Sequence, residues 1–142
     1  MARNEAQGAG VRKAMANLEA LPTFDAEGAV HVIVEAPRSS RVKCKYDSDL
    51  GAFVLGKPLP HGVTYPFDWG FIPSTKGEDG DPLDALVLHD AACPVGCVIA
   101  CRPIAALRVS QKQRGSDVEE NDRFILVPAR DKTVREDMLS VA

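Results

Sequence analysis

The chain has 142 residues, with 45% hydrophobic and 26% charged side chains, which is the balance of a single soluble globular domain. No apolar run reaches the roughly 18 residues of a membrane-spanning helix, and the N-terminus has no apolar signal core, so we expect no membrane association and a cytoplasmic location. Seventeen basic and twenty acidic residues give a net charge of −3, which is a poor match for a nucleic-acid binder.

Taken in chain order, the hydrophobic pattern predicts mostly extended structure. Residues 1–17 are a loose N-terminal extension, although the apolar spacing over 11–21 favours a short helix. Apolar or alternating stretches predict strands at 31–35, 41–47, 52–57, 85–88, 97–109 and 123–128. Residues 111–122 are polar, as expected of a hairpin tip or surface loop.

A possible capping box at Thr133 and Glu136 predicts that 131–142 begins a C-terminal helix. The sum is one domain over 1–142, of mainly β (α+β) class. The expected architecture is a small closed barrel, predominantly antiparallel, with five or six short strands and small helices at its ends.

The four cysteines leave two interpretations open. Three of them, Cys93, Cys97 and Cys101, recur at four-residue spacing. A zinc site is conceivable, but CxxC pairs are missing and the three histidines are scattered along the chain. Buried apolar filler is therefore the preferred interpretation of these cysteines.

Aromatic and acidic residues gather in the stretch 65–88. Tyr65, Phe67, Trp69 and Phe71 alternate, so an extended chain would place them on one side, as in a core strand. A tight loop follows, with acidic residues at Glu78, Asp79, Asp81 and Asp84. A solvated acidic turn is one explanation, and a hard divalent cation that offsets the carboxylate repulsion is the other. An EF-hand is excluded, because its loop requires glycine where Asp84 stands.

Basic residues on the predicted strands complement this acidic loop. The alternation over 41–47 places Lys43 and Lys45 on the polar face of their strand, Lys57 ends the next strand, and Arg123 opens the last one. Mg²⁺ commonly shares its ligand shell with phosphate oxygens. Acids on one loop and cations at nearby strand ends therefore indicate a site for Mg²⁺ and a phosphate compound.

The motif DGDPLD at 79–84, followed by ALVL, resembles the signature loop of the family I soluble inorganic pyrophosphatases. Further similar segments follow in that family's order: VIVEAP, VKCKYD, LGAFVLGK, YPFDWGFIP, PVGCVIACRP and NDRFILVP. The resemblance covers roughly residues 18–130. It implies a five-stranded OB-like barrel, Mg²⁺ (with Mn²⁺ or another divalent metal possible), hydrolysis of pyrophosphate to two phosphates, and a homo-oligomer, commonly a hexamer in bacteria.

The resemblance also implies roles for individual residues. Asp79, Asp84 and, from the 110–122 loop, Asn121 and Asp122 would hold metal, and Asp81 would accept the proton of the attacking water. Lys43, Lys57, Trp69 and Arg123 would bind substrate. Glu35 and Tyr65 would stand one layer behind these groups and support them.

Several residues depart from the family pattern. Lys45 replaces a Glu, Lys57 an Arg, Trp69 a Tyr and Arg123 a Lys. One metal carboxylate maps to Asn121, with Asp122 beside it. The other maps to 111–112, which holds no carboxylate, although Asp117 could compensate. The family's C-terminal helix carries a phosphate-binding Tyr-Lys pair beyond residue 142.

Because the strand pattern is complete by Pro128, we expect the 142-residue chain to fold and to bind metal. Because it lacks the Tyr-Lys pair and one metal carboxylate and has Trp69 in place of a Tyr, we expect it to hydrolyse pyrophosphate poorly. Two other functions stay open. One is a non-catalytic or weakly active barrel that binds metal or phosphate. The other is an OB-type nucleic-acid binder whose aromatic strand stacks bases, which the charge and the acidic loop disfavour.

Overall fold

A computed structural model describes residues 17–112 and 118–129. It contains one helical turn, a 3-10 helix over Leu18–Ala20, and nine strands. The strands are β1 (Val30–Ala36), β2 (Val42–Asp47), β3 (Ala52–Pro58), β4 (Asp68–Ile72), β5 (Leu83–Val87), β6 (Val98–Leu107), β7 (Ser110–Lys112), β8 (Val118–Glu120) and β9 (Arg123–Pro128). Within these residues, no helix has the length and hydropathy needed to cross a membrane.

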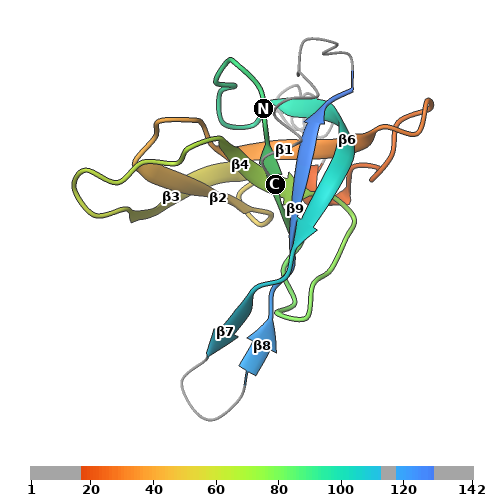
Figure 1. The fold of residues 1–142 in the computed structure, drawn as a ribbon. Helices are drawn as coiled ribbons and strands as arrows, with labels where there is room; N and C mark the ends of the chain where they lie inside the picture. The colour runs from red at the N-terminus through yellow and green to blue at the C-terminus, as the bar shows by residue number, and fades with distance from the viewer. Residues whose placement is uncertain (1–16, 113–117, 130–142) are drawn as a thin grey trace, which may run out of the picture.

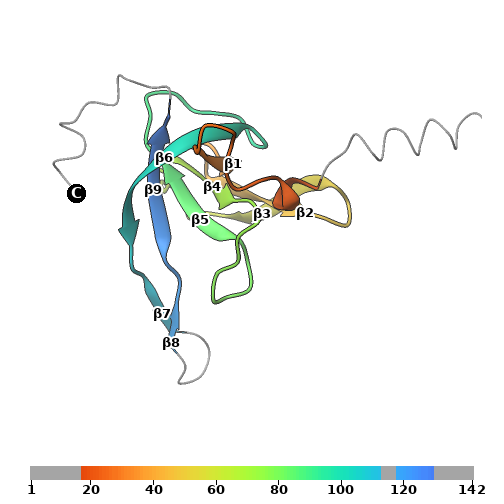
Figure 2. The same ribbon diagram turned by 90° about the vertical axis from the view of Figure 1, so that its right-hand side faces the viewer.

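Five strands close into a barrel in the order β1-β4-β5-β9-β6, which confirms the predicted mainly β barrel (Figure 1). β2 and β3 form a separate two-stranded sheet. β7 and β8 form a hairpin that projects beyond the barrel (Figure 2). The antiparallel expectation was wrong for one pair, because β5 and β9 run parallel. Parallel pairing is possible there because the long excursion through β6, β7 and β8 returns the chain in the same direction.

The barrel core follows from alternation along the strands. Val32 on β1, Ala85 and Val87 on β5 and Leu126 on β9 are fully buried in one cluster. Ile33, the neighbour of Val32, points the other way and packs with Tyr46 and Phe71 in a second cluster. β1 is therefore buried on both faces, between the barrel interior and the β2–β3 sheet.

Of the remaining expectations about local structure, one is confirmed, one is corrected and others lie outside the described residues. The hairpin expected within 111–122 is confirmed by the pairing of β7 with β8. The helix expected over 11–21 is reduced, in its described part, to the 3-10 turn capped by Asn17. The segments 1–16 and 130–142, including the predicted C-terminal helix, lie outside the described residues.

The aromatic stretch is not one core strand. β4 begins only at Asp68, so Tyr65 and Phe67 precede it, and of the four aromatic residues only Phe71 is buried in the core. Proline at position 66 lacks an N–H for strand pairing, which explains the late start. Trp69 stays half-buried, and its ring lies 5.8 Å from that of Tyr65.

Candidate metal and phosphate site

The candidate site lies on the outer face of the barrel, where β2 and β3 approach it. Leu83, Ala85 and Val87 of β5 belong to the interior cluster or pack against it, so alternation turns Asp84 outward. The same parity turns Glu35 of β1 and Trp69 of β4 outward. Arg123 of β9 is the direct register partner of Asp84. The barrel thus presents two acids, an indole and a guanidinium from four neighbouring positions.

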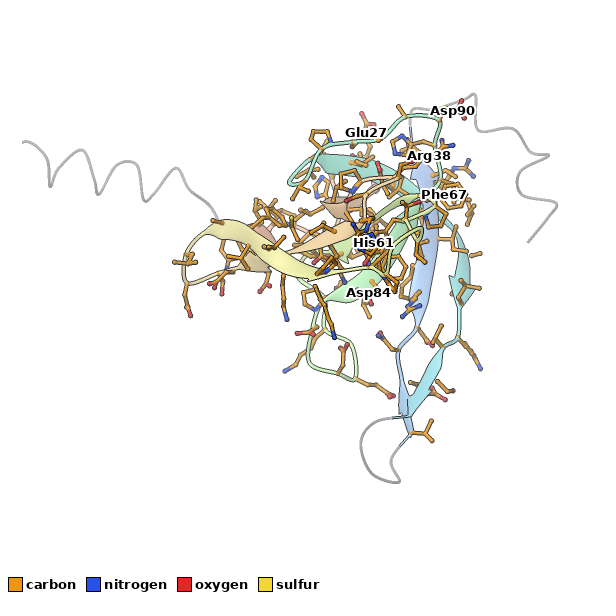
Figure 3. All side chains as sticks on the ribbon, turned by 90° about the vertical axis from the view of Figure 1, so that its left-hand side faces the viewer. Glu27, Arg38, His61, Phe67, Asp84 and Asp90 are labelled. Carbon is orange, nitrogen blue, oxygen red and sulfur yellow. The ribbon has the colours of Figure 1, made fainter. Side chains whose placement is uncertain are left out.

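A cleft of about 350 Å³ occupies this face. Its lining includes the predicted residues Glu35, Lys43, Lys57, Tyr65, Asp81 and Asp84. It also includes Lys45, which the sequence placed beside Lys43 on the polar face of its strand. The other lining residues of the cleft were not assigned to the site: Glu19, Tyr46, Gly56, Phe71 and Pro82. Figure 3 shows the labelled Asp84 on the body of the barrel, beside the β2–β3 sheet. Residues 40 positions apart in the chain therefore share one hollow.

Lys43 lies close to two acidic side chains and to the indole of the site. Its Nζ lies 3.8 Å from Glu35 Oε1 and 4.0 Å from Asp84 Oδ1, and it lies 5.6 Å from the centroid of the Trp69 ring. The Arg123 guanidinium is 4.9 Å from the same ring centroid. Two cations thus flank the indole at the edge of the acidic cleft, in the manner of cation–π pairs.

Gly56 allows Lys57 to stand close to Lys43. A Cβ at position 56 would lie 2.0 Å from the Lys43 carbonyl oxygen, so only glycine lets β3 approach the irregular step between Val42 and Cys44 on β2. This approach brings the backbone of the residue before Lys57 against that of Lys43. Both ammonium groups consequently serve one cleft.

Burial and like charge shift the acids of the cleft. Burial, reinforced by Asp84, raises the pKa of Glu35 to about 7, while Lys43 opposes the shift. Burial also raises the pKa of Asp84, with Lys43 and Arg123 opposing and Asp79 reinforcing. The pKa of Tyr65 rises through burial and the nearby Glu35 and Asp84. A cation bound here would relieve this crowding of negative charge.

The predicted metal ligands do not all line one hollow. Asp81 and Asp84 line the main cleft, whereas Asn121 and Asp122 line a second hollow of about 190 Å³ on the other side of the acidic loop. Asn121 of the second hollow lies close enough to Asp84 of the first to lower the pKa of that carboxyl. Asp79 lines neither hollow, and its Oδ1 accepts a hydrogen bond from the Asp81 N–H at 3.0 Å.

Three buried polar atoms of predicted site residues have no hydrogen-bond partner within the described chain. They are the donors Trp69 Nε1 and Arg123 Nε and the acceptor Asp122 Oδ1. A buried polar atom without a partner costs about 1–3 kcal/mol, so such atoms point to a ligand. The oxygen donors of Asp84, Asn121 and Asp122 are of the kind that a hard divalent cation such as Mg²⁺ or Mn²⁺ prefers. The two donors fit an anion.

Sequence reasoning missed a second polar group, at the opposite end of β4 and β5. Asp68 is fully buried, and its carboxylate accepts hydrogen bonds from His89 Nε2 at 2.5 Å and from the Cys93 N–H at 3.0 Å. The interpretation of all three clustered cysteines as buried filler was wrong. Only Cys101 is buried, whereas Cys93 and Cys97 are half-buried. The sequence offered one signal for this group, which is the carboxylate at position 68 between two aromatic residues.

Comparison with known proteins places these features in a family. The family model for inorganic pyrophosphatase matches residues 32–141. The chain is 46% identical over 106 residues to the inorganic pyrophosphatase of Thermus thermophilus, covering 74% of this chain and 60% of that one. It is 39% identical over 115 residues to that of Synechocystis, covering 81% of this chain and 65% of the relative. The chain therefore spans 60–65% of the length of these relatives.

Structural comparison agrees. The crystal structure of the Thermus thermophilus inorganic pyrophosphatase superposes with a TM-score of 0.73 at 42% identity, covering 82% of this chain and 65% of that one. The structure of an inorganic pyrophosphatase from Neisseria gonorrhoeae gives 0.69 at 32% identity, covering 79% and 62%.

Proposed function

Because this chain belongs to the inorganic pyrophosphatase family, we propose that it hydrolyses pyrophosphate to two phosphates in the cleft beside Asp84. The observation that carries the proposal is one hollow lined by both Asp81 and Asp84 and by both Lys43 and Lys57. Carboxylates suit a divalent cation and ammonium groups suit phosphate oxygens, and pyrophosphate complexed with a metal needs both.

The metal proposed for this site is Mg²⁺, with Asp79, Asp84, Asn121 and Asp122 as the residues that hold it. Bound there, the metal supplies charge neutralisation of the substrate and a lowered pKa for bound water. Asp84 is the central residue of this set, because it alone of the four lines the main cleft and Asn121 lies close enough to lower its pKa. Asp79 contributes by closing the loop on the Asp81 N–H.

The chain's own groups orient and stabilise the substrate. Lys43, between Glu35 and Asp84, holds one phosphoryl group, and Lys57 holds the other from the β3 side. Preorganised cations of this kind stabilise the charge that grows on the leaving phosphate. Trp69 Nε1 and Arg123 Nε, both buried donors without partners in the described chain, offer further hydrogen bonds to phosphate oxygens.

Asp81 is proposed as the proton acceptor. It is exposed at the mouth of the cleft, so it can be reached by water and by substrate. As a water oxygen attacks one phosphorus, Asp81 takes a proton from it and the bridging P–O bond breaks, which leaves two phosphates. Glu35, whose pKa of about 7 lets it bind a proton near neutrality, supports Lys43 from behind.

We further propose a cytoplasmic homo-oligomer, with a hexamer as the specific expectation. Large hydrophobic side chains that are exposed in the single chain support self-association: Phe24 is 59% and Leu55 79% exposed. The proposal that 1–142 forms one domain rests on the described barrel and on the family match, which reaches residue 141.

The test is phosphate release from pyrophosphate by the purified chain, with and without Mg²⁺, compared with Asp84→Asn. We expect release that requires Mg²⁺ and that falls in the variant by roughly 10²–10³, the effect of losing one preorganised charge-stabilising group. Asp49→Asn is the matched control, because Asp49 is an exposed carboxylate in the β2–β3 turn. Equal release by Asp84→Asn and Asp49→Asn would move the reaction away from this cleft.

A further inference from the structure

The polar group at the end of β4 is organised around one buried carboxylate. Asp68 has no exposed surface. Its Oδ1 accepts the Arg38 N–H at 2.8 Å, and its Oδ2 accepts His89 Nε2 at 2.5 Å and the Cys93 N–H at 3.0 Å. These donors come from the β1–β2 connection and from two positions of the β5–β6 connection. Asp68 thus gathers three segments that are distant in sequence.

Two thiols join this group. Cys93 Sγ lies within 4.8 Å of an Asp68 carboxylate oxygen, and burial, reinforced by the nearby Cys97, raises the pKa of the Cys93 thiol. A tight turn brings Cys97 back to Cys93: the Cys97 N–H donates to the Pro94 carbonyl at 3.1 Å, and Gly96 takes a φ of +90°. The positive φ favours glycine, so the residue type at 96 suits the return of Cys97.

The turn is also anchored on the barrel. The Gly96 N–H donates to the Val34 carbonyl at 2.9 Å, and the Val34 N–H donates to the Cys97 carbonyl at 3.0 Å. Val34 is fully buried in β1. Both thiols therefore stand on fixed backbone, which a preorganised ligand site requires.

The donor atoms converge. One oxygen of Asp68, one ring nitrogen of His89 and Cys93 Sγ all lie within 4.8 Å of one another. This is the only group of three such residues that converges in this way in the described part of the chain. His89 is 10% exposed at its side chain, and the site is thus shielded but open at one edge.

We propose that Asp68, His89 and Cys93 form a Zn²⁺ site. Thiolate sulfur and imidazole nitrogen select Zn²⁺ over Mg²⁺, and one sulfur, one nitrogen and one oxygen leave the fourth tetrahedral position to water. Binding releases the Cys93 thiol proton to solvent, and His89 coordinates through Nε2 as the neutral ring, with its proton on Nδ1.

Only a small local movement is required. His89 Nε2 and Asp68 Oδ2 are 2.5 Å apart. They separate to roughly 3.3 Å, the edge of a tetrahedron whose bonds are about 2.0–2.1 Å. Asp68 keeps the Arg38 N–H on its other oxygen. The metal would tie β4 to the β5–β6 connection.

This site is separate from the proposed catalytic cleft. Asp84 is the second residue of β5 and pairs with Phe71, whereas His89 follows the end of β5 and Asp68 pairs with Val87 at that end. Figure 3 shows Arg38 and Asp90, the neighbours of this group, toward one end of the barrel and Asp84 toward the other. The Zn²⁺ proposal therefore stands or falls independently of pyrophosphate hydrolysis.

The experiment is Zn²⁺ titration of the reduced, metal-stripped full chain in competition with a chromophoric chelator. We expect one Zn²⁺ per chain, and a weakening of at least 100-fold in both His89→Ala and Cys93→Ser. Co²⁺ in place of Zn²⁺ should give the thiolate-to-metal absorption band of a tetrahedral sulfur site, and both variants should lose it. Asp68 is not substituted, because its burial makes misfolding the expected result.

Two controls separate this site from others. Cys44→Ser removes a thiol on β2, outside the group, and should leave Zn²⁺ affinity unchanged. Asp49→Asn, which removes an exposed carboxylate in the β2–β3 turn, should do the same. Circular dichroism of each metal-free variant establishes that it is folded. Absence of stoichiometric Zn²⁺ binding to the folded, reduced chain overturns the proposal, as does unchanged affinity in folded His89→Ala and Cys93→Ser.

Discussion

The two ends of β5 carry polar groups of opposite chemistry. At the start of the strand, Asp84 meets Lys43, Glu35 and Asp81 in a cleft of oxygens and ammonium groups. Beyond its end, His89 meets Asp68 and the Cys93 thiol. Alternation explains the division, because Asp84 faces outward toward β2 while Asp68 lies on the inward-facing parity of β4. One strand pair can thus present a hard-cation site and a soft-cation site at separate ends.

The largest expected effect is on the affinity for Mg²⁺ or Mn²⁺ at the start of β5, where Asp84 lies. Asp84→Ala should weaken Mg²⁺ or Mn²⁺ binding by on the order of 100-fold, because carboxylate charge sets divalent affinity. Isothermal titration with Mn²⁺ measures it. Asp49→Asn, which also removes one carboxylate, should titrate like the unsubstituted chain. An unchanged Mn²⁺ affinity in Asp84→Ala would remove the hard-cation site from this loop.

The second effect is pH-dependent stability from Glu35. Its pKa is about 7 when folded and about 4.5 when unfolded, so the folded state binds more protons between these values. The contribution of Glu35 to the free energy of unfolding of the metal-free chain should therefore be largest below pH 4.5. It should fall as the pH rises to 7. The loss amounts to on the order of 3 kcal/mol.

Denaturant unfolding at pH 5 and pH 8 measures this dependence. Glu35→Gln carries no charge at either pH, so its free energy of unfolding should change much less across the interval than that of the parent chain. Parallel curves for both proteins would mean that burial does not hold Glu35 protonated.

The third effect concerns the backbone that places Lys57. Gly56→Ala puts a Cβ 2.0 Å from the Lys43 carbonyl oxygen, which forces β2 and β3 apart. We expect a loss of about 1–3 kcal/mol in the free energy of unfolding, together with weaker phosphate binding. Ala52→Ser is the control, because Ala52 is exposed on the same strand. A neutral Gly56→Ala would show that the close approach does not position the lysines.

The smallest expected effect is at Lys57 itself. Lys57→Arg should tighten phosphate binding severalfold, because a guanidinium can make two parallel hydrogen bonds where an ammonium offers a point charge. Lys57→Gln should weaken binding. Competition by inorganic phosphate should show the highest phosphate affinity with Arg at position 57, a lower affinity with Lys and the lowest with Gln. Any other order would place Lys57 outside contact with phosphate.

Sequence reasoning reached the two ends of β5 unequally, for a physical reason. The acidic site is concentrated in one short loop, and Lys43 and Lys57 lie on strands whose alternation is visible, so their common face could be predicted. Asp68, His89 and Cys93 are distant in sequence and meet only through the pairing of β4 with β5 and the course of the β5–β6 connection. Which strands pair with one another depends on contacts between distant segments, which a local pattern does not contain.

Prediction of the fold from the sequence meets the same limit, because local patterns do not reveal contacts between distant segments. Strand positions and the barrel class follow from hydrophobic periodicity. The parallel pairing of β5 with β9 and the separation of β2–β3 from the barrel depend on contacts between distant segments. Proline at 66 delayed β4 despite a strongly aromatic pattern, because a proline cannot donate to a strand ladder.

The most direct test of the central proposal is turnover by Asp81→Asn. Calorimetry should show that this variant still binds Mg²⁺, while phosphate release from pyrophosphate falls by roughly 10²–10⁴, the usual worth of a general base. Asp49→Asn should release phosphate as the parent chain does. Turnover by Asp81→Asn equal to that of the parent would contradict the assignment of proton transfer to this cleft.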